Sequence, residues 1–307
     1  MSASPLLDLR PLSISELFDR TFRIFRQHFV TFLTIAAITQ LPIAVFQILS
    51  TVLLGSAATS TNLEASILNG EFIGTTILVA IGVLILSGIV TQIGTAALTT
   101  AISDSYLGRE ISFDSAFSRM GNTWLTLILA TIVAGLIIVA LFIPVGIISI
   151  IPCLGPLIAI VGFFIIGVAA NVLISLLPPV VVLEKAGAIA SVKRAWDLSR
   201  LRFWWVFGYL FLLSILTAAI IFGPTALISF ALPAIMGNTN VLLQSIIQQS
   251  ANLVLTAVFL PIRLAAITLM YFDLRIRFEG FDLMVLASNK DEFAADASDL
   301  TTTGLSC

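Results

Sequence analysis

The stretch that decides the fold is MGNTWLTLILATIVAGLIIVALFIPVGIISIIPCLGPLIAIVGFFIIGVAANVLISLLPPVVVL, residues 120–183, in which 64 residues pass without a charge. A second uncharged stretch of 60 residues runs from Phe203 to Ile262. About 20 apolar residues cross the hydrocarbon layer of a bilayer, so each stretch can cross it twice. The whole chain agrees: 59% of its 307 residues are hydrophobic, 10% are charged, and the mean hydropathy is +1.11. This composition predicts a membrane protein.

Turn-forming residues divide both stretches. Pro144, Gly146 and the string IPCLGP at 151–156 interrupt the first, and Pro233 and Gly237 begin the interruption of the second. A third pair of apolar runs precedes them, joined by polar residues at 55–71. We therefore predict an all-α, polytopic transmembrane helical bundle with six spans. The expected spans lie near 28–54, 72–102, 122–150, 157–183, 203–233 and 241–272.

Basic residues predict the orientation of these spans, because Lys and Arg beside membrane spans are retained on the cytoplasmic side. Of the 15 Lys and Arg residues, all but Arg263 lie before span 1, between spans 2 and 3, between spans 4 and 5, or after span 6. The three opposite loops contain none. Both termini are therefore expected in the cytosol, and the basic cytosolic face could attract anionic lipid headgroups.

A short amphipathic segment precedes each odd-numbered span, at 13–29, 112–124 and 188–205. In the first, Leu17, Phe22 and Phe25 recur at helical spacing opposite Arg20 and Arg23, which suits a helix lying in the headgroup plane. This pattern predicts three repeats of an interfacial amphipathic helix followed by a transmembrane hairpin. The alternative is that aromatic and basic residues collect at any membrane boundary.

Three stretches carry a resemblance to a known family: RPLSISELFDRTFRIFRQHF at 10–29, VVVLEKAGAIASVKRAWDLSRLRFWWVFG at 180–208, and YFDLRIRFEGFDL at 271–283. With them the chain resembles bacterial proteins classed with the glycerophosphoryl diester phosphodiesterase membrane domain and, more distantly, the YciC-like six-span inner-membrane proteins. The resemblance implies a multi-pass protein of the bacterial cytoplasmic (inner) membrane. In some relatives a soluble phosphodiesterase domain is fused to the membrane part, and this sequence lacks it.

Arg263 is the strongest single candidate for a ligand-binding residue, because an ionisable residue inside a span is costly and usually faces a protein or aqueous interior. On a helix, Gln244, Gln248, Asn252, Thr256 and Arg263 fall within an arc of roughly 120°, which we call the polar stripe. The stripe could line a cavity for an anionic headgroup or solute. Alternatively, its side chains bond to Gln40, Gln47, Gln92 or Asn171 of other spans as ordinary packing contacts.

Cations next to the spans are candidates for contact with lipid or a partner. They are Lys193, Arg194, Arg200, Arg202, Arg275 and Arg277. For the last two there is an alternative, because Asp273 with Arg277 and Arg275 with Glu279 are spaced as i,i+4 ion pairs at the end of a helix.

The sequence contains no known catalytic signature, and its single histidine and the lack of carboxylates inside the spans argue against an intramembrane enzyme. We expect no cofactor, no metal site and no nucleic-acid partner. The function we expect is a non-enzymatic module, spanning 1–287, that organises membrane lipids or a protein partner, with a homo-oligomer as a further option. A transporter or channel for a small, anionic solute is the alternative. Residues 288–307 are expected to form a disordered, acidic cytosolic tail.

Overall fold

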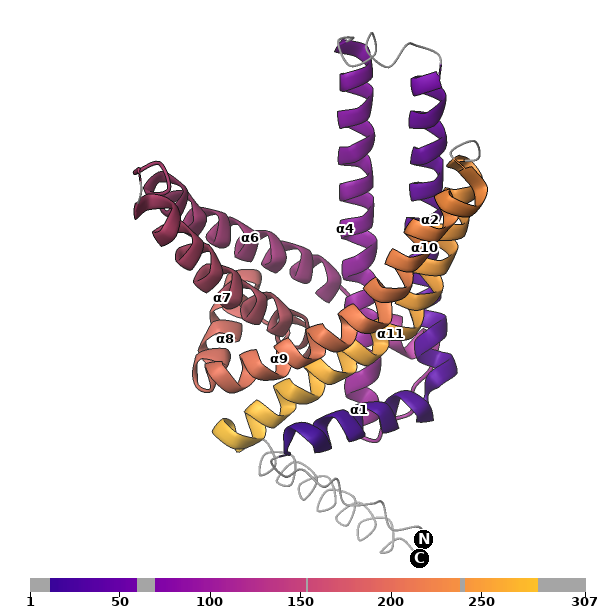
Figure 1. Ribbon diagram of the computed structural model, residues 1–307. Helices are drawn as coiled ribbons and strands as arrows, with labels where there is room; N and C mark the ends of the chain where they lie inside the picture. Colours follow the sequence, from indigo (N-terminus) through magenta and orange to yellow (C-terminus); the bar gives the residue numbers. More distant parts are fainter. Residues whose placement is uncertain (1–11, 60–69, 153, 238–240, 281–307) are drawn as a thin grey trace, which may run out of the picture.

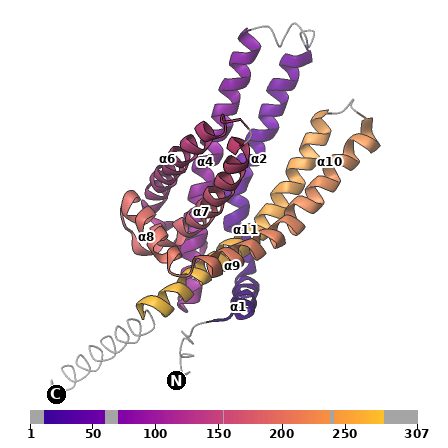
Figure 2. The same cartoon turned by 60° about the vertical axis from the view of Figure 1, so that its left-hand side comes forward.

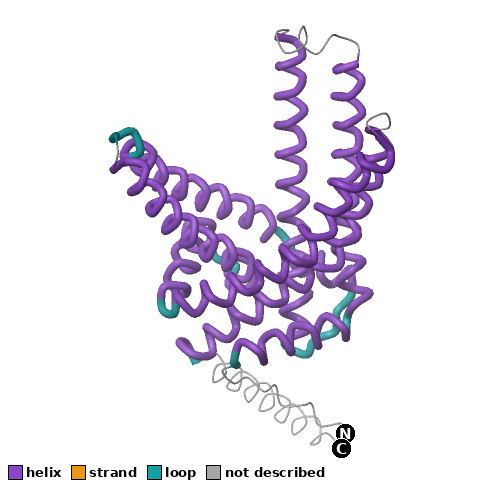
Figure 3. Tube along the Cα trace, viewed as in Figure 1, coloured by secondary structure: helices purple, strands orange, loops and turns teal. Residues whose placement is uncertain are grey.

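The computed structural model describes residues 12–59, 70–152, 154–237 and 241–280. Figure 3 shows helices joined by short loops and no strand in this part of the chain, as predicted. The predicted acidic tail at 288–307 and residues 60–69 of the first polar loop lie outside the described residues.

Six of the helical segments are long and apolar enough to cross a membrane, which confirms the predicted number of spans. Their bounds are α2 (Phe29–Thr59), α4 (Gly70–Tyr106), α6 (Thr123–Ile148), α7 (Leu154–Glu184), the continuous segment α9 (Phe203–Thr217), η1 (Ala218–Phe222) and α10 (Gly223–Met236), and α11 (Val241–Glu279). Both ends of each agree with the predicted spans to within about five residues, except that α11 ends at Glu279, beyond the expected residue 272.

Three short helices alternate with the hairpins, so the predicted order of one short helix and two long ones occurs three times. They are α1 (Ile14–Gln27), α5 (Phe113–Met120) and α8 (Ala188–Arg200). Local sequence fixes where the first two begin. Ser13 and Glu16 cap each other's backbone N–H groups before α1, and Ser112 and Ser115 do the same before α5.

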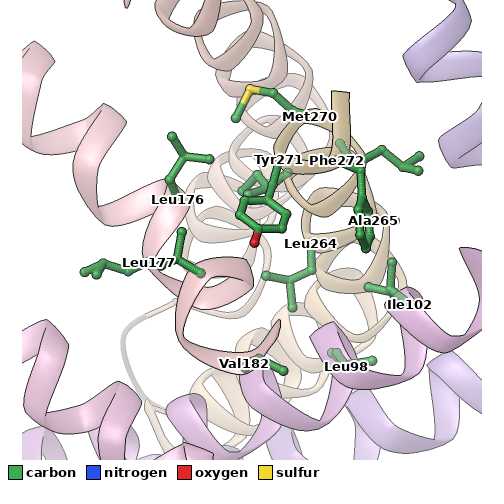
Figure 4. Close-up of a cluster of buried hydrophobic side chains, with 14 of the residues drawn as sticks. Leu98, Ile102, Leu176, Leu177, Val182, Leu264, Ala265, Met270, Tyr271 and Phe272 are labelled. Carbon is green, nitrogen blue, oxygen red and sulfur yellow. The ribbon is translucent and has the colours of Figure 1, made fainter. Parts of the chain in front are cut away.

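The three hairpins converge at one end of the molecule, which we call the base. Here α2, α6 and α9 begin, α4, α7 and α11 end, and α1 lies across the foot of the bundle (Figure 1). Away from the base the hairpins diverge, and α10 and α11 also stand apart from α2 and α4 after rotation (Figure 2). Buried side chains are concentrated near the base. Figure 4 shows Leu98 and Ile102 of α4, Leu176 and Leu177 of α7, and several residues of α11 in one cluster.

Prolines of both uncharged stretches lie inside spans. Pro144 lies inside α6 and Pro233 inside α10, within the predicted spans 122–150 and 203–233. A helix in a membrane tolerates proline when neighbouring groups satisfy the freed carbonyls. Span 5 accommodates its Gly223-Pro224 pair with the π-helical turn η1 just before it.

The amphipathic helix expected at 13–29 is present as α1, and its apolar side packs on the protein. Leu17, Ile24 and Phe25 are buried against the protein, and α1 packs mainly on α11. Only Phe22 and Phe29 remain as exposed as expected, each at 40%. The amphipathic pattern was real, but periodicity alone cannot tell whether a helix packs on lipid or on another helix.

Candidate functional site

The C-terminal end of α11 clamps the chain just before α1. The Asp273 carboxylate accepts a hydrogen bond from the backbone N–H of Leu12 at 2.7 Å and a second from Arg277 Nε at 2.7 Å. Arg277 in turn donates from Nη2 to the Leu12 carbonyl at 2.7 Å. The Asp273 side chain is fully buried. The predicted i,i+4 pair is therefore confirmed, and it also satisfies a backbone donor and a backbone acceptor that would otherwise lack partners.

Beside this clamp, five residues form a closed ring of hydrogen bonds and ion pairs. Arg194 of α8 binds Glu184 at the end of α7, at 2.9 Å, and Glu279 at the end of α11. Arg275 Nε binds Glu279 at 3.0 Å and Arg275 Nη1 donates to the Tyr271 hydroxyl at 3.4 Å. The ring closes where Tyr271 donates to Glu184 at 2.8 Å. It ties the second and third repeats together.

The two carboxylates around Arg194 determine the direction in which its pKa shifts. Burial alone would lower the pKa of Arg194, but hydrogen bonds to Glu184 and Glu279 and the attraction of both carboxylates raise it above its ordinary value. Arg194 therefore stays charged and acts as a structural cross-link, with about a third of its side chain exposed.

A third group of charges joins the first and second repeats. Asp104, whose side chain is 5% exposed near the end of α4, binds Arg109 Nη1 at 3.2 Å and Arg119 Nη1 at 2.9 Å. Both arginines keep about half of their own surface exposed, at 59% and 47%. One carboxylate thus holds two guanidinium groups in place and leaves one positive charge uncompensated.

These two arginines line a pocket of about 540 Å³ at the base, which we call the base pocket. Its other charged lining residues are Lys185 and Arg275, and Asp104 is its one carboxylate. Arg275 is balanced by Glu279, whereas the Lys185 side chain is exposed and forms no ion pair or hydrogen bond with the described residues. The pocket walls come from α4, α5, α7, α11 and the turn after α7, so all three repeats contribute. The basic side chains of the lining outnumber the carboxylate, so the pocket carries excess positive charge.

Lys185 also has an unusual backbone. Its φ of 50° is the only positive value at a non-glycine position among the described residues. It sits directly after α7, where glycine commonly ends a helix in the left-handed conformation. An L-residue there costs roughly 1–2 kcal/mol. Strained residues of this kind cluster at functional sites, which directs attention to the pocket that Lys185 lines.

Of the six cations predicted to contact lipid or a partner, only Arg275 lines the base pocket. Arg194 and Arg277 are engaged within the protein. Arg200 pairs with Asp197 at 3.1 Å, Arg202 lies over the Trp205 ring at 5.1 Å, and Lys193 is exposed on α8. Sequence reasoning missed Asp104, Arg109, Arg119 and Lys185 as site residues. The available signal was that basic residues from successive cytosolic loops must meet at one end of a hairpin bundle.

The residues of the polar stripe on α11 do not all lie at one site. Gln248, Asn252 and Thr256 line two adjoining pockets of about 250 and 330 Å³ inside the spans. Gln244 instead donates to the carbonyl of Gly237 at 2.5 Å and so secures the end of α10. Arg263 is exposed, its side chain forms no ion pair or hydrogen bond with the described residues, and it is not among the residues that line either pocket.

The residues proposed as packing partners of the stripe also differ in their contacts. Gln92 of α4 donates to Thr131 of α6 at 2.9 Å, which is an ordinary contact between spans. Gln40 and Gln47 of α2 line the same pockets as the stripe, and their side-chain amides form no hydrogen bond with the described residues. Asn171 is exposed on α7. No group of three His, Cys, Asp or Glu residues that could hold a metal ion occurs in the part of the chain that the structure describes.

Six apolar helices that converge on a cationic base define this chain as a multi-pass helical membrane protein. Residues 12–274 match the family described as "Domain of unknown function (DUF7847)", and since this covers most of the chain, the chain belongs to that family. No curated protein and no solved structure matches the sequence. The resemblance to the glycerophosphoryl diester phosphodiesterase membrane domain and to the YciC-like proteins stays a prediction.

Proposed function

We propose that this chain is a non-enzymatic membrane module that binds anionic lipid headgroups at its base and so organises lipids or partner proteins around it. The observation that carries the proposal is the base pocket. Two guanidinium groups share one carboxylate there, and Lys185 adds a positive charge without a counter-ion. Guanidinium and ammonium groups at a membrane surface attract phosphate oxygens, at about 1 kcal/mol per residue.

The proposed location is the cytoplasmic face of a bacterial inner membrane, with both termini in the cytosol. The distribution of Lys and Arg supports this orientation, because the base collects the basic residues that flank the spans and the opposite loops have none. Anionic lipids give the cytoplasmic leaflet a negative surface potential, which suits a base with excess positive charge.

A second pocket supports a lipid as the ligand. It has a volume of about 360 Å³ and lies between α6, α7 and α8, and its lining is apolar except for Lys193 and Trp196 on α8. Ile189 beside it is 74% exposed. An apolar slot with a cation and an indole on one of its walls fits an acyl chain below an anionic headgroup.

The experiment compares a basic residue of the base pocket with one outside both pockets. Purified protein in detergent is titrated with phosphatidylglycerol, which is anionic, or with phosphatidylcholine, which is zwitterionic, and binding is followed by native mass spectrometry. Lys185→Gln should weaken phosphatidylglycerol binding roughly fivefold, which corresponds to about 1 kcal/mol. Arg200→Gln removes a positive charge from an exposed side chain that pairs with Asp197 and lines neither pocket, and should change binding less than twofold.

A further variant, Lys185→Gly, separates weaker lipid binding from a loss of folding. Glycine relieves the positive φ of residue 185, so this variant should unfold at the same or a higher temperature while still binding phosphatidylglycerol more weakly. Equal effects of the two Gln variants, or equal binding of the two lipids, would rule out the base pocket as an anionic-headgroup site.

A transporter or channel remains the alternative proposal. It is favoured by the two polar pockets inside the spans, between α2, α4, α10 and α11.

A further inference from the structure

The two polar pockets inside the spans share Gln47, Gln249 and Asn252, so they are parts of one depression. Gln40 adds a fourth amide side chain and Gln248 a fifth. We call this depression the amide groove and define it by these five residues of α2 and α11. Hydroxyl groups of Ser87 and Thr91 on α4 and of Thr225 on α10 complete its polar lining.

The groove lies well away from the base. Gln40 and Gln47 are about 16 and 27 Å along α2 from its first residue, at 1.5 Å per residue. Ser87 is about 28 Å from the C-terminal end of α4 by the same measure. All three positions fall inside the helical segments that are apolar enough to span a membrane. Polar groups here face the hydrocarbon layer unless protein or water surrounds them.

Three of the five amide side chains have no partner in the part of the chain that the structure describes. Gln248 donates to Ser229 and Asn252 accepts from Thr256, but Gln40, Gln47 and Gln249 form no side-chain hydrogen bond with the described residues. The hydroxyls of Ser87 and Thr225 are already donated to carbonyls of their own helices. An amide left without a partner in an apolar medium costs several kcal/mol, so these side chains require water or a solute in the groove.

The chemistry of the lining selects the class of solute. Each amide offers two N–H donors and one carbonyl acceptor, and the residues that line the two pockets include no charged side chain. Arg263, the reason for expecting an anion, is not among them. A small uncharged molecule that both donates and accepts hydrogen bonds matches this lining, whereas an anion would lose its hydration and find no cation.

One wall of the groove has an irregular backbone. The π-helical turn η1 in span 5 contributes Ile221 and Phe222 to the lining. Such turns are rare, cost regular hydrogen bonds and occur frequently at functional sites. We propose that the amide groove is a hydrated binding site for a small uncharged solute of the amide or polyol class. This proposal concerns binding inside the spans and does not depend on lipid binding at the base.

The test measures how fast a cysteine in the groove reacts. In a Cys153→Ser, Cys307→Ser background, Ser87→Cys is compared with Ser214→Cys in vesicles. Both serines lie within spans and donate to a carbonyl of their own helix, but Ser214 is exposed on α9 and does not line the groove. Because the thiolate is the reactive form and needs water, Ser87→Cys should react with N-ethylmaleimide at least tenfold faster.

Solute binding is then detected as protection. Acetamide or glycerol, titrated up to about 1 M, should slow the labelling of Ser87→Cys at least threefold and leave that of Ser214→Cys unchanged. Acetate has the shape of acetamide and a negative charge, and should not protect. Adding Gln249→Leu should abolish protection by the neutral solutes, because the substitution removes an unpartnered amide from the wall.

Three results would overturn the proposal: labelling of Ser87→Cys as slow as that of Ser214→Cys, protection by acetate equal to that by acetamide, or protection that survives Gln249→Leu. If Ser87→Cys fails to fold, as judged by thermal unfolding in detergent, Thr91→Cys reports from the same wall of the groove. Loss of phosphatidylglycerol binding at the base would leave these outcomes unaffected.

Discussion

Two polar regions lie on the same helix, α11, and differ in how their polar groups are satisfied. At the base, Asp273 is fully buried and accepts from both Leu12 and Arg277, and the neighbouring ring leaves none of its five members without a partner. About 36 Å further along the helix, at 1.5 Å per residue, Gln249 lines the amide groove with no partner among the described residues.

This difference separates what holds the fold from what is available to a ligand. A buried charge must be paired because its desolvation is expensive, so the base network can be removed only at a large cost in stability. A neutral amide can remain unpaired where water reaches it. We therefore expect substitutions at the base to change stability and substitutions in the amide groove to change binding.

The largest expected effect comes from the clamp. Asp273→Ala leaves Arg277 and the Leu12 N–H without their shared acceptor, and should lower the free energy of unfolding by about 3 kcal/mol or more. The measurement is unfolding by sodium dodecyl sulfate in mixed micelles. The control is Asp197→Ala, which breaks the exposed pair with Arg200 and should cost less than about 1 kcal/mol. Equal losses would mean that the clamp is not structural.

A smaller effect is expected where α2 and α4 pack closely, between the base and the amide groove. A Cβ atom at Gly94 would lie 2.7 Å from Thr39 Oγ1 and 2.9 Å from Thr39 Cβ. Thr39 cannot easily move, since its hydroxyl is held by the carbonyls of Ile35 and Ala36. Gly94→Ala should therefore destabilise the protein by about 1–3 kcal/mol in the same assay.

Gly88→Ala is the matched control for this substitution, because a Cβ at Gly88 would meet nothing within 4 Å. It should be neutral or stabilising by up to about 1 kcal/mol, since alanine favours helix more than glycine does. If Gly94→Ala behaves in the same way, α2 and α4 are not held together at this point.

Much of the architecture followed from the sequence because few physical rules govern it. Long uncharged runs and the turns between them predict spans, and the amphipathic segment at 13–29 predicts the short helix α1. The i,i+4 pairs at the end of α11 were also predictable, because both partners lie on one helix.

The sites were predicted only in part, because they depend on contacts between distant segments. Asp104 with Arg119 and Glu184 with Arg194 join different helices, and no periodicity shows which loops meet. Helical spacing correctly grouped Gln248, Asn252 and Thr256, but it could not show that Gln244 binds the end of α10 or that Arg263 is absent from the lining. Spacing defines a face of a helix, whereas a site also needs the facing helix.

The smallest expected effect concerns two glutamines of neighbouring spans. Gln92→Leu removes a hydrogen bond to Thr131 and should cost about 0.6 kcal/mol, the average for such contacts between spans. Gln47→Leu removes a side-chain amide that has no partner within residues 12–59, 70–152, 154–237 and 241–280. Leucine is cheaper to place in an apolar medium, so stability should be unchanged or slightly higher. Both are measured by the unfolding assay used for Asp273→Ala. If Gln47→Leu destabilises the protein as much as Gln92→Leu does, Gln47 is a packing residue. The contrast between paired polar groups at the base and unpaired amides in the groove would then not hold for Gln47.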